Sequence, residues 1–284
     1  MLRYLRSRAG LPTLLVLLVV SLAGNVILAL VLSSAFEKLQ VTRIFPLGYV
    51  PQGTPASPGG AKPFLAFWGD SRASFWASEA RAAGRDVVNL AHGGQTSSQV
   101  LLQIRATPLD SRYAVAQFGI NDIHPLGTLP EHRAIILERL HGNIIAVRDA
   151  LLERSDVVIL TTIFPPGRVP LQRRAFWDSR SLEYIEHANA AILAAADGVR
   201  VFVIDAHAIL CDERGYLRPE YRDHDFFLHV NREAYAALNA ELGRVLDESA
   251  ARRGGAIATA PSTVGEVSFQ RENALLEQQP TRDR

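Results

Sequence analysis

The hydrophobic pattern divides the chain into one long apolar run near the N-terminus and a later region of short apolar runs that alternate with helical stretches. The first run extends from Leu11 to Leu32, and only three polar residues interrupt it. At about 1.5 Å per residue, a helix of this length crosses the hydrocarbon core of a bilayer, which is roughly 30 Å thick. The pattern therefore predicts one transmembrane helix within a first segment, residues 1–35.

Charges on either side of this run predict its orientation. Three arginines precede it with no acidic residue among them, whereas Glu37 and Lys38 give the other side a mixed flank. The positive-inside rule then keeps the N-terminus in the cytoplasm and places the rest of the chain outside, in the periplasm or the extracellular space. A cleaved signal peptide is the alternative, because residues 33–35 (Ser-Ser-Ala) form a small-residue cleavage site. The apolar part of a signal peptide is only about 7–15 residues long, which favours an uncleaved anchor.

Alternating elements follow a linker. Residues 36–62 are interpreted as the linker, because their second half is rich in Pro, Gly and Ser. Strands are expected at 64–68, 86–90, 114–118, 156–161 and 200–204, and helices at 74–83, 97–106, 130–154, 181–196 and 231–250. Such alternation implies right-handed βαβ units and a parallel sheet covered on both faces. We expect one α/β domain over residues 63–250 and a disordered polar tail over 251–284.

Net charge and cysteine content argue against nucleic-acid binding and against cysteine-based zinc sites. The net charge is +1, from 30 basic and 29 acidic residues, so nothing electrostatic suggests a nucleic-acid partner. The one cysteine, Cys211, can form neither an intrachain disulfide nor a cysteine-based zinc site, and it is expected to be a small buried residue.

Candidate catalytic residues follow the first three strands, where open α/β sheets form their sites. Ser71 ends the triplet Gly-Asp-Ser after the first strand, as a candidate nucleophile whose own backbone N–H can face an oxyanion. Paired glycines, including Gly94, follow the second strand and let the backbone approach a ligand closely. Asn121 follows the third strand, and its amide can donate to developing negative charge. Each feature alone is also typical of an ordinary turn or helix cap.

A candidate base precedes the last helix. His229 has a side chain whose pKa normally lies near working pH, and Asp225 or Asp223 could orient its ring. A structural histidine or a metal ligand are the alternatives, although no third well-spaced ligand set or His-Glu-x-x-His pattern is visible. A nucleophile, two oxyanion donors and a base thus fall at four successive places that the fold would bring to one edge of the sheet.

In this order the motifs resemble the SGNH hydrolases, also called GDSL-like esterases and lipases, over most of residues 63–250. The resemblance implies a flavodoxin-like three-layer sandwich with a five-stranded parallel sheet. It also implies that Ser71 is the nucleophile, His229 the base, and Gly94 and Asn121 oxyanion donors beside the Ser71 N–H. No metal or organic cofactor is expected.

One departure from the family concerns the acid of the triad. The family places this Asp three residues before the His, where this chain has Phe226. Asp225, four residues before the His, is the expected replacement. A Ser–His pair oriented by another acceptor is the alternative.

The expected function is that of a membrane-anchored, extracytoplasmic serine esterase acting on carboxylic esters with short acyl groups. Its substrate would be an ester, such as an acylated glycan or lipid, and its one expected partner surface is the membrane. Three other interpretations stay open at this stage: an O-acyltransferase acting on a surface or secreted polysaccharide, a non-catalytic binding module, and a membrane scaffold.

Overall fold

Five parallel strands form one sheet in the computed structural model, which describes residues 10–46, 62–223 and 227–259. The strands lie in the order β2-β1-β3-β4-β5, which is the flavodoxin-like order. Their bounds are Leu65–Gly69 for β1, Val87–Asn89 for β2, Ser111–Gln117 for β3, Ser155–Thr161 for β4 and Val201–Ile204 for β5. The expected α/β fold with a five-stranded parallel sheet is confirmed.

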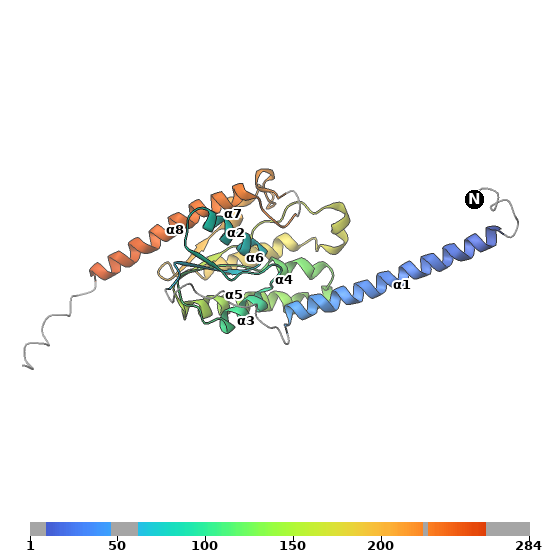
Figure 1. Cartoon of the computed structure of the whole chain (residues 1–284), viewed down its shortest axis with the longest axis horizontal. Helices are drawn as coiled ribbons and strands as arrows, with labels where there is room; N and C mark the ends of the chain where they lie inside the picture. The colour runs from blue at the N-terminus through green and yellow to red at the C-terminus, as the bar shows by residue number, and fades with distance from the viewer. Residues whose placement is uncertain (1–9, 47–61, 224–226, 260–284) are drawn as a thin grey trace, which may run out of the picture.

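Helices cover both faces of the sheet (Figure 1). One face packs against α3 (Ser97–Ala106), α5 (Arg133–Leu152) and α6 (Ser181–Ala194), and the other against α2 (Ser71–Ala82), α7 (Ala206–Leu210) and α8 (Arg232–Thr259). Shorter elements follow the strands or join the helices: α4 (Ile120–Ile123) and the 3-10 helices η3 (His124–Gly127), η4 (Pro130–His132), η5 (Leu171–Phe176) and η6 (Pro219–Tyr221).

Burial explains why the predicted strands are short apolar runs instead of alternating ones. Residues 157–160 of β4 are all at most 1% exposed, because helices cover both faces of a parallel sheet. In α5 the buried residues recur at helical spacing, so that one stripe faces the sheet: Ile136, Leu140, Ile144, Val147 and Leu151. The hydrophobic pattern was therefore a reliable guide to each layer.

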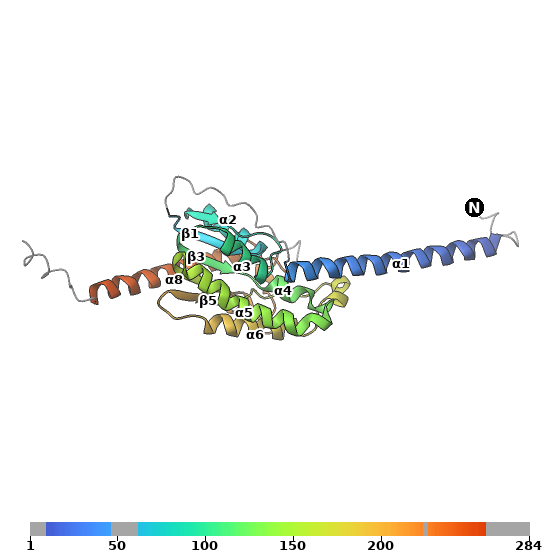
Figure 2. The same cartoon turned by 90° about the horizontal axis from the view of Figure 1, so that it is seen from below.

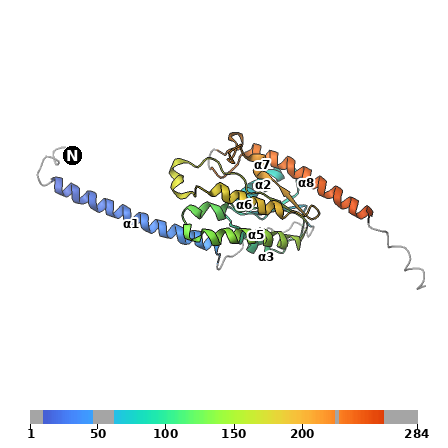
Figure 3. The ribbon, with the colours of Figure 1, turned by 180° about the vertical axis from the view of Figure 1, so that it is seen from behind.

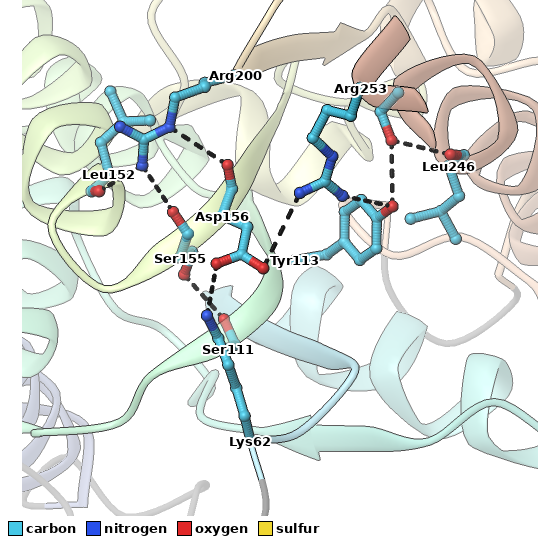
Figure 4. A network of polar contacts seen from close by, with 10 residues as sticks. Lys62, Ser111, Tyr113, Leu152, Ser155, Asp156, Arg200, Leu246 and Arg253 are labelled. Carbon is cyan, nitrogen blue, oxygen red and sulfur yellow. Dashed lines mark hydrogen bonds and ion pairs between the residues drawn. The ribbon is translucent and has the colours of Figure 1, made fainter. Parts of the chain in front are cut away.

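A polar network fixes the amino edge of the sheet (Figure 4). The hydroxyls of Ser111 and Ser155 are 2.8 Å apart and join the starts of β3 and β4. Arg253 of α8 donates to the Tyr113 hydroxyl over 3.0 Å and lies 3.9 Å from the carboxylate of Asp156. These polar groups bond to one another and connect α8 to the strands, which indicates a structural role. The candidate catalytic residues lie at the opposite, carboxyl edge of the sheet.

The N-terminal helix α1 extends from Gly10 to Ile44. Among the described residues it is the one helix long and apolar enough to cross a membrane, and residues 11–39 are exposed. The prediction of a linker from residue 36 onward is wrong for its first nine residues. Residues 36–44 continue the helix, and Ile44 is buried in the core of the domain. Residues 25–45 contain no proline or glycine, so nothing in this stretch ends the helix before Pro46.

The two ends of the chain show where the expected boundaries do not hold. α8 continues to Thr259 and so includes the first nine residues assigned to the tail, whereas residues 260–284 lie outside the described residues. Seen from behind, α1 leaves one end of the domain and α8 leaves the other (Figure 3). Residues 47–61 of the expected linker also lie outside the described part of the chain.

Candidate active site

The turn from β1 into α2 places Ser71 at the carboxyl edge of the sheet. Gly69 ends β1 with φ +136°, and a Cβ there would lie 1.7 Å from the Gln117 carbonyl oxygen, so only glycine fits. Asp70 then caps α2, its carboxylate accepting the Arg72 backbone N–H over 2.8 Å. Ser71 is consequently the first residue of the helix and stays half-buried at the end of a central strand.

The structure brings Ser71 and His229 together although 158 residues separate them in the chain. Ser71 Oγ lies 3.2 Å from His229 Nε2, which is within reach for proton transfer between a nucleophile and a base. The loop before α8 carries His229, and the Asp223 backbone N–H donates to its carbonyl over 3.4 Å. The ring of Phe75, one turn after Ser71, meets the imidazole edge-on at 5.3 Å.

The surroundings of His229 favour its neutral form. Burial lowers the pKa of His229 below its ordinary value, the positive charge of Arg72 lowers it further, and the negative charge of Asp223 opposes both effects. A neutral imidazole can accept a proton, so His229 is suited to act as a base at neutral pH.

Arg72 is a residue of this site that the sequence did not reveal. Its side chain is fully buried, and its guanidinium donates to the carbonyl of Leu228 over 2.6 Å and to that of Phe164 over 2.8 Å. The hydroxyl of Tyr235, in α8, donates back to the Arg72 carbonyl over 3.2 Å. Arg72 therefore ties the first turn of α2 to the residue directly before His229, which helps to fix the side chains of Ser71 and His229 relative to each other.

The glycine pair after β2 approaches the same serine. A Cβ at Gly93 would lie 4.0 Å from the Ser71 Cβ, and Gly94 has φ +76°, a left-handed conformation that favours glycine. Thr96 and Gln99 form a capping box at the start of α3. The loop thus carries Gly94 to the edge where Ser71 lies.

Asn121 lies in α4, directly after β3, and its Nδ2 donates to the Gln95 carbonyl over 3.0 Å. Its neighbour Asp122 accepts the backbone N–H of Ser97 over 2.9 Å and the Ser97 hydroxyl over 2.7 Å. Burial raises the pKa of Asp122 to about 6, while the bonds from Ser97 act in the opposite direction. The loops after β2 and β3 are therefore held to each other by a buried polar network that sequence reasoning did not identify.

The last turn of α1 also reaches this network. The guanidinium of Arg43 donates to the Gly94 carbonyl and, over 3.4 Å, to the Gln40 side chain. In return the Thr96 hydroxyl donates to the Arg43 carbonyl over 2.7 Å. The apolar helix is thus joined to the glycine loop of the candidate site.

Of the predicted site residues, Ser71, Gly94, Asn121 and His229 all lie at the carboxyl edge of the sheet, at the positions described above. Asp225 lies outside the described residues, so the structure places only the neighbouring Asp223. Glu37, Glu131 and His132 have ligand atoms within 4.8 Å of one another, and this partly exposed group could hold a cation. None of these three belongs to the predicted catalytic set.

Comparisons with known proteins give the family and similar folds. Residues 52–237 match the sequence model of the GDSL-like lipase/acylhydrolase family. A GDSL-like lipase from Bacteroides thetaiotaomicron is 22% identical, with a TM-score of 0.55 over 75% of this chain and 97% of that one. A candidate acylhydrolase from Bacteroides fragilis is 21% identical, with a TM-score of 0.56 over 69% of this chain and 91% of that one. No curated protein matches the chain.

Proposed function

Because the chain belongs to the GDSL-like lipase/acylhydrolase family, a family of hydrolases that act on ester bonds, we propose that it is a serine esterase in which Ser71 and His229 carry out the chemistry. The observation that carries this assignment is the 3.2 Å contact between Ser71 Oγ and His229 Nε2. Two polar side chains so far apart in sequence meet at the carboxyl edge of a parallel sheet, which is where this fold class forms its sites.

The reaction follows from this contact. His229 Nε2 accepts the hydroxyl proton as Ser71 Oγ attacks the ester carbonyl, and the carbonyl oxygen becomes an oxyanion. The tetrahedral intermediate collapses to an acyl-enzyme, and the alcohol leaves with the proton that His229 returns. Water then repeats the sequence, with His229 taking its proton, and releases the carboxylic acid and free Ser71.

Three donors are assigned to the oxyanion: the backbone N–H groups of Ser71 and Gly94, and the amide of Asn121. Ser71 is the first residue of α2, so its N–H lies at the positive end of the helix dipole. An amide carries two N–H donors, and Asn121 uses one for the Gln95 carbonyl. The other is the donor that we assign to the oxyanion.

We assign α1 to the membrane as a single-pass anchor, with the catalytic domain outside the cytoplasm. Its apolar residues are exposed along the helix, which is costly in water and favourable in lipid. The arginines before the helix support a cytoplasmic N-terminus.

The esterase assignment is tested with the full chain in detergent and p-nitrophenyl acetate as substrate. We expect Ser71→Ala and His229→Ala each to lower turnover by about 10⁴-fold or more, as removal of a nucleophile or base does in serine hydrolases. Ser78→Ala is the matched control, since Ser78 is an exposed serine on the same helix. Turnover by Ser71→Ala close to that of the control would refute the assignment. If the unmodified chain is also inactive, acceptor sugars are added to test for acyl transfer.

A further inference from the structure

The short helix η5 presents large apolar side chains to solvent. Leu171 is 76% exposed and Phe176 is 59% exposed, at the two ends of a six-residue segment. Arg173 and Arg174 lie between them. Exposed apolar residues interleaved with arginines are characteristic of segments that lie in the interface of a membrane.

η5 lies beside the part of α1 where the apolar run ends. Phe176 and Thr128 line a cavity of about 620 Å³ together with seven residues of α1 between Ala29 and Leu39. This stretch of α1 contains the end of the apolar run at Leu32 and the first acidic residue, Glu37. If the apolar run lies in the hydrocarbon core, Phe176 lies at the level where that core meets the lipid headgroups.

We propose that η5 and the adjoining part of α1 form one membrane-contacting surface, with a lipid bilayer as its occupant. Leu171 and Phe176 enter the boundary between headgroups and acyl chains, and Arg174 lies among the lipid phosphates. This proposal rests on the proposed function in one respect, namely that α1 is a membrane anchor. It adds that the catalytic domain lies directly on the bilayer and is not held away from it.

The arrangement of the domain supports this orientation. α1, α4 and the end of the domain that carries η5 lie on the same side, whereas α8 extends from the opposite side (Figure 2). Trp177, directly after η5, meets the ring of Phe227 at 5.3 Å, and Phe227 lies two residues before His229. Arg173 lies over the same Phe227 ring, at 5.9 Å. The surface is therefore continuous with the loop that carries the base, so that the active site opens toward esters presented at the bilayer.

The test places a fluorescent probe on η5 of the full chain in lipid nanodiscs. In a Cys211→Ser background, Leu171→Cys is labelled with an environment-sensitive fluorophore, and Val199→Cys is labelled as the control. Val199 is 63% exposed and apolar like Leu171, but it precedes β5 and so lies at the amino edge of the sheet. We expect blue-shifted emission and quenching by headgroup-labelled quencher lipids at position 171, and neither effect at position 199.

Two outcomes distinguish failure of the membrane-contacting surface from failure of the anchor assignment on which it rests. If alkaline carbonate releases the chain from vesicles, the anchor assignment fails and the membrane-contacting surface fails with it. If the chain stays in the membrane but the probes at 171 and 199 are equally unquenched, only the surface is refuted, and a protein partner for η5 becomes the question.

A double variant, Leu171→Ser with Phe176→Ser, tests the functional consequence. Neither residue belongs to the catalytic set, so hydrolysis of soluble p-nitrophenyl acetate should stay unchanged. Hydrolysis of the acetate ester of a long-chain alcohol, embedded in the same nanodisc, should fall several-fold. An equal rate on the embedded ester in both proteins would mean that η5 does not orient the active site on the bilayer.

Discussion

The guanidinium of Arg43, in the last turn of the apolar helix, donates a hydrogen bond to the carbonyl oxygen of Gly94, the proposed oxyanion donor. The backbone of Arg43 is held in turn by the Thr96 hydroxyl, and Ile44 is buried in the domain core. The segment that leaves the proposed membrane anchor is thus a structural part of the active-site loop. Loss of the Arg43 side chain should therefore affect catalysis.

Arg43→Ala should lower kcat and leave KM nearly unchanged. Loss of the guanidinium frees the Gly94 carbonyl, and a displaced loop no longer directs the Gly94 N–H at the oxyanion. A displacement of about 1 Å can cost 10²-fold in rate, so we expect a decrease in kcat of roughly ten- to a hundredfold. Kinetics of the full chain in detergent measure this, with Thr42→Ala as the control.

Thr42 is the appropriate control because it is the preceding residue of the same helix and is exposed, its hydroxyl bonding only locally to the Lys38 carbonyl. Wild-type kcat in both variants would show that the glycine loop holds its shape without Arg43. A rise in KM alone would instead assign Arg43 to substrate binding.

Gly94→Ala tests the same loop through its backbone. A non-glycine residue in the left-handed region costs about 1–2 kcal/mol, and the added Cβ would lie 2.7 Å from the Arg43 guanidinium. Gly84→Ala is a matched control, since Gly84 has φ +83° and no atom within 4 Å of the added Cβ. Both variants should lose similar stability in thermal denaturation. Only Gly94→Ala should also lose activity, by about tenfold or more, and equal activities would exclude Gly94 from the site.

Arg72 should contribute both to stability and to the placement of the base. Arg72→Met leaves the buried carbonyls of Leu228 and Phe164 without these donors, and each buried acceptor left unsatisfied costs about 1–3 kcal/mol. We expect a decrease of this order in the free energy of unfolding, measured by denaturant titration. Tyr235→Phe removes only the hydroxyl that donates to the Arg72 carbonyl, so it should cost about 1 kcal/mol. Similar losses for the two variants would mean that the guanidinium contacts contribute little.

The sequence predicted the layers well because they depend on local patterns. Apolar runs gave the strands, and the helical spacing of Ile136 to Leu151 gave the helix α5. The polar end of α1 was assigned to a linker, because its burial depends on contacts with α3, which is distant in sequence. Local patterns do not contain such information.

The same distinction applies to the site. Ser71, Gly94, Asn121 and His229 could be identified because each follows a strand or precedes a helix in a recognisable motif. Their supports, Arg72 and Arg43, could not be. An arginine in a helix turn is usually exposed, and only the assembled fold shows that Arg72 is buried between two loops. A buried cation that joins distant backbone carbonyls has no sequence signature, so these two arginines were missed, whereas the residues proposed to react lie in recognisable motifs.

The last prediction concerns the acid that orients His229. Catalysis requires the neutral imidazole, and burial together with Arg72 lowers the pKa of His229, so the acid limb of the kcat/KM profile should lie below pH 6.5. Asp223 raises this pKa, so Asp223→Asn should move the acid limb to still lower pH. A profile measured from about pH 4 to 8 checks both the position and the direction of the shift.

The size of the decrease in kcat then shows whether Asp225 or Asp223 orients His229. In a serine hydrolase, neutralising the aspartate that orients the histidine lowers kcat by about 10⁴-fold even where the imidazole is neutral. We expect a loss approaching this size for Asp225→Asn, with Asp223→Asn acting mainly on the pH profile. The reverse pattern would assign the orienting role to Asp223. Near wild-type turnover in both variants would mean that Ser71 and His229 act as a pair, and that another acceptor holds the ring.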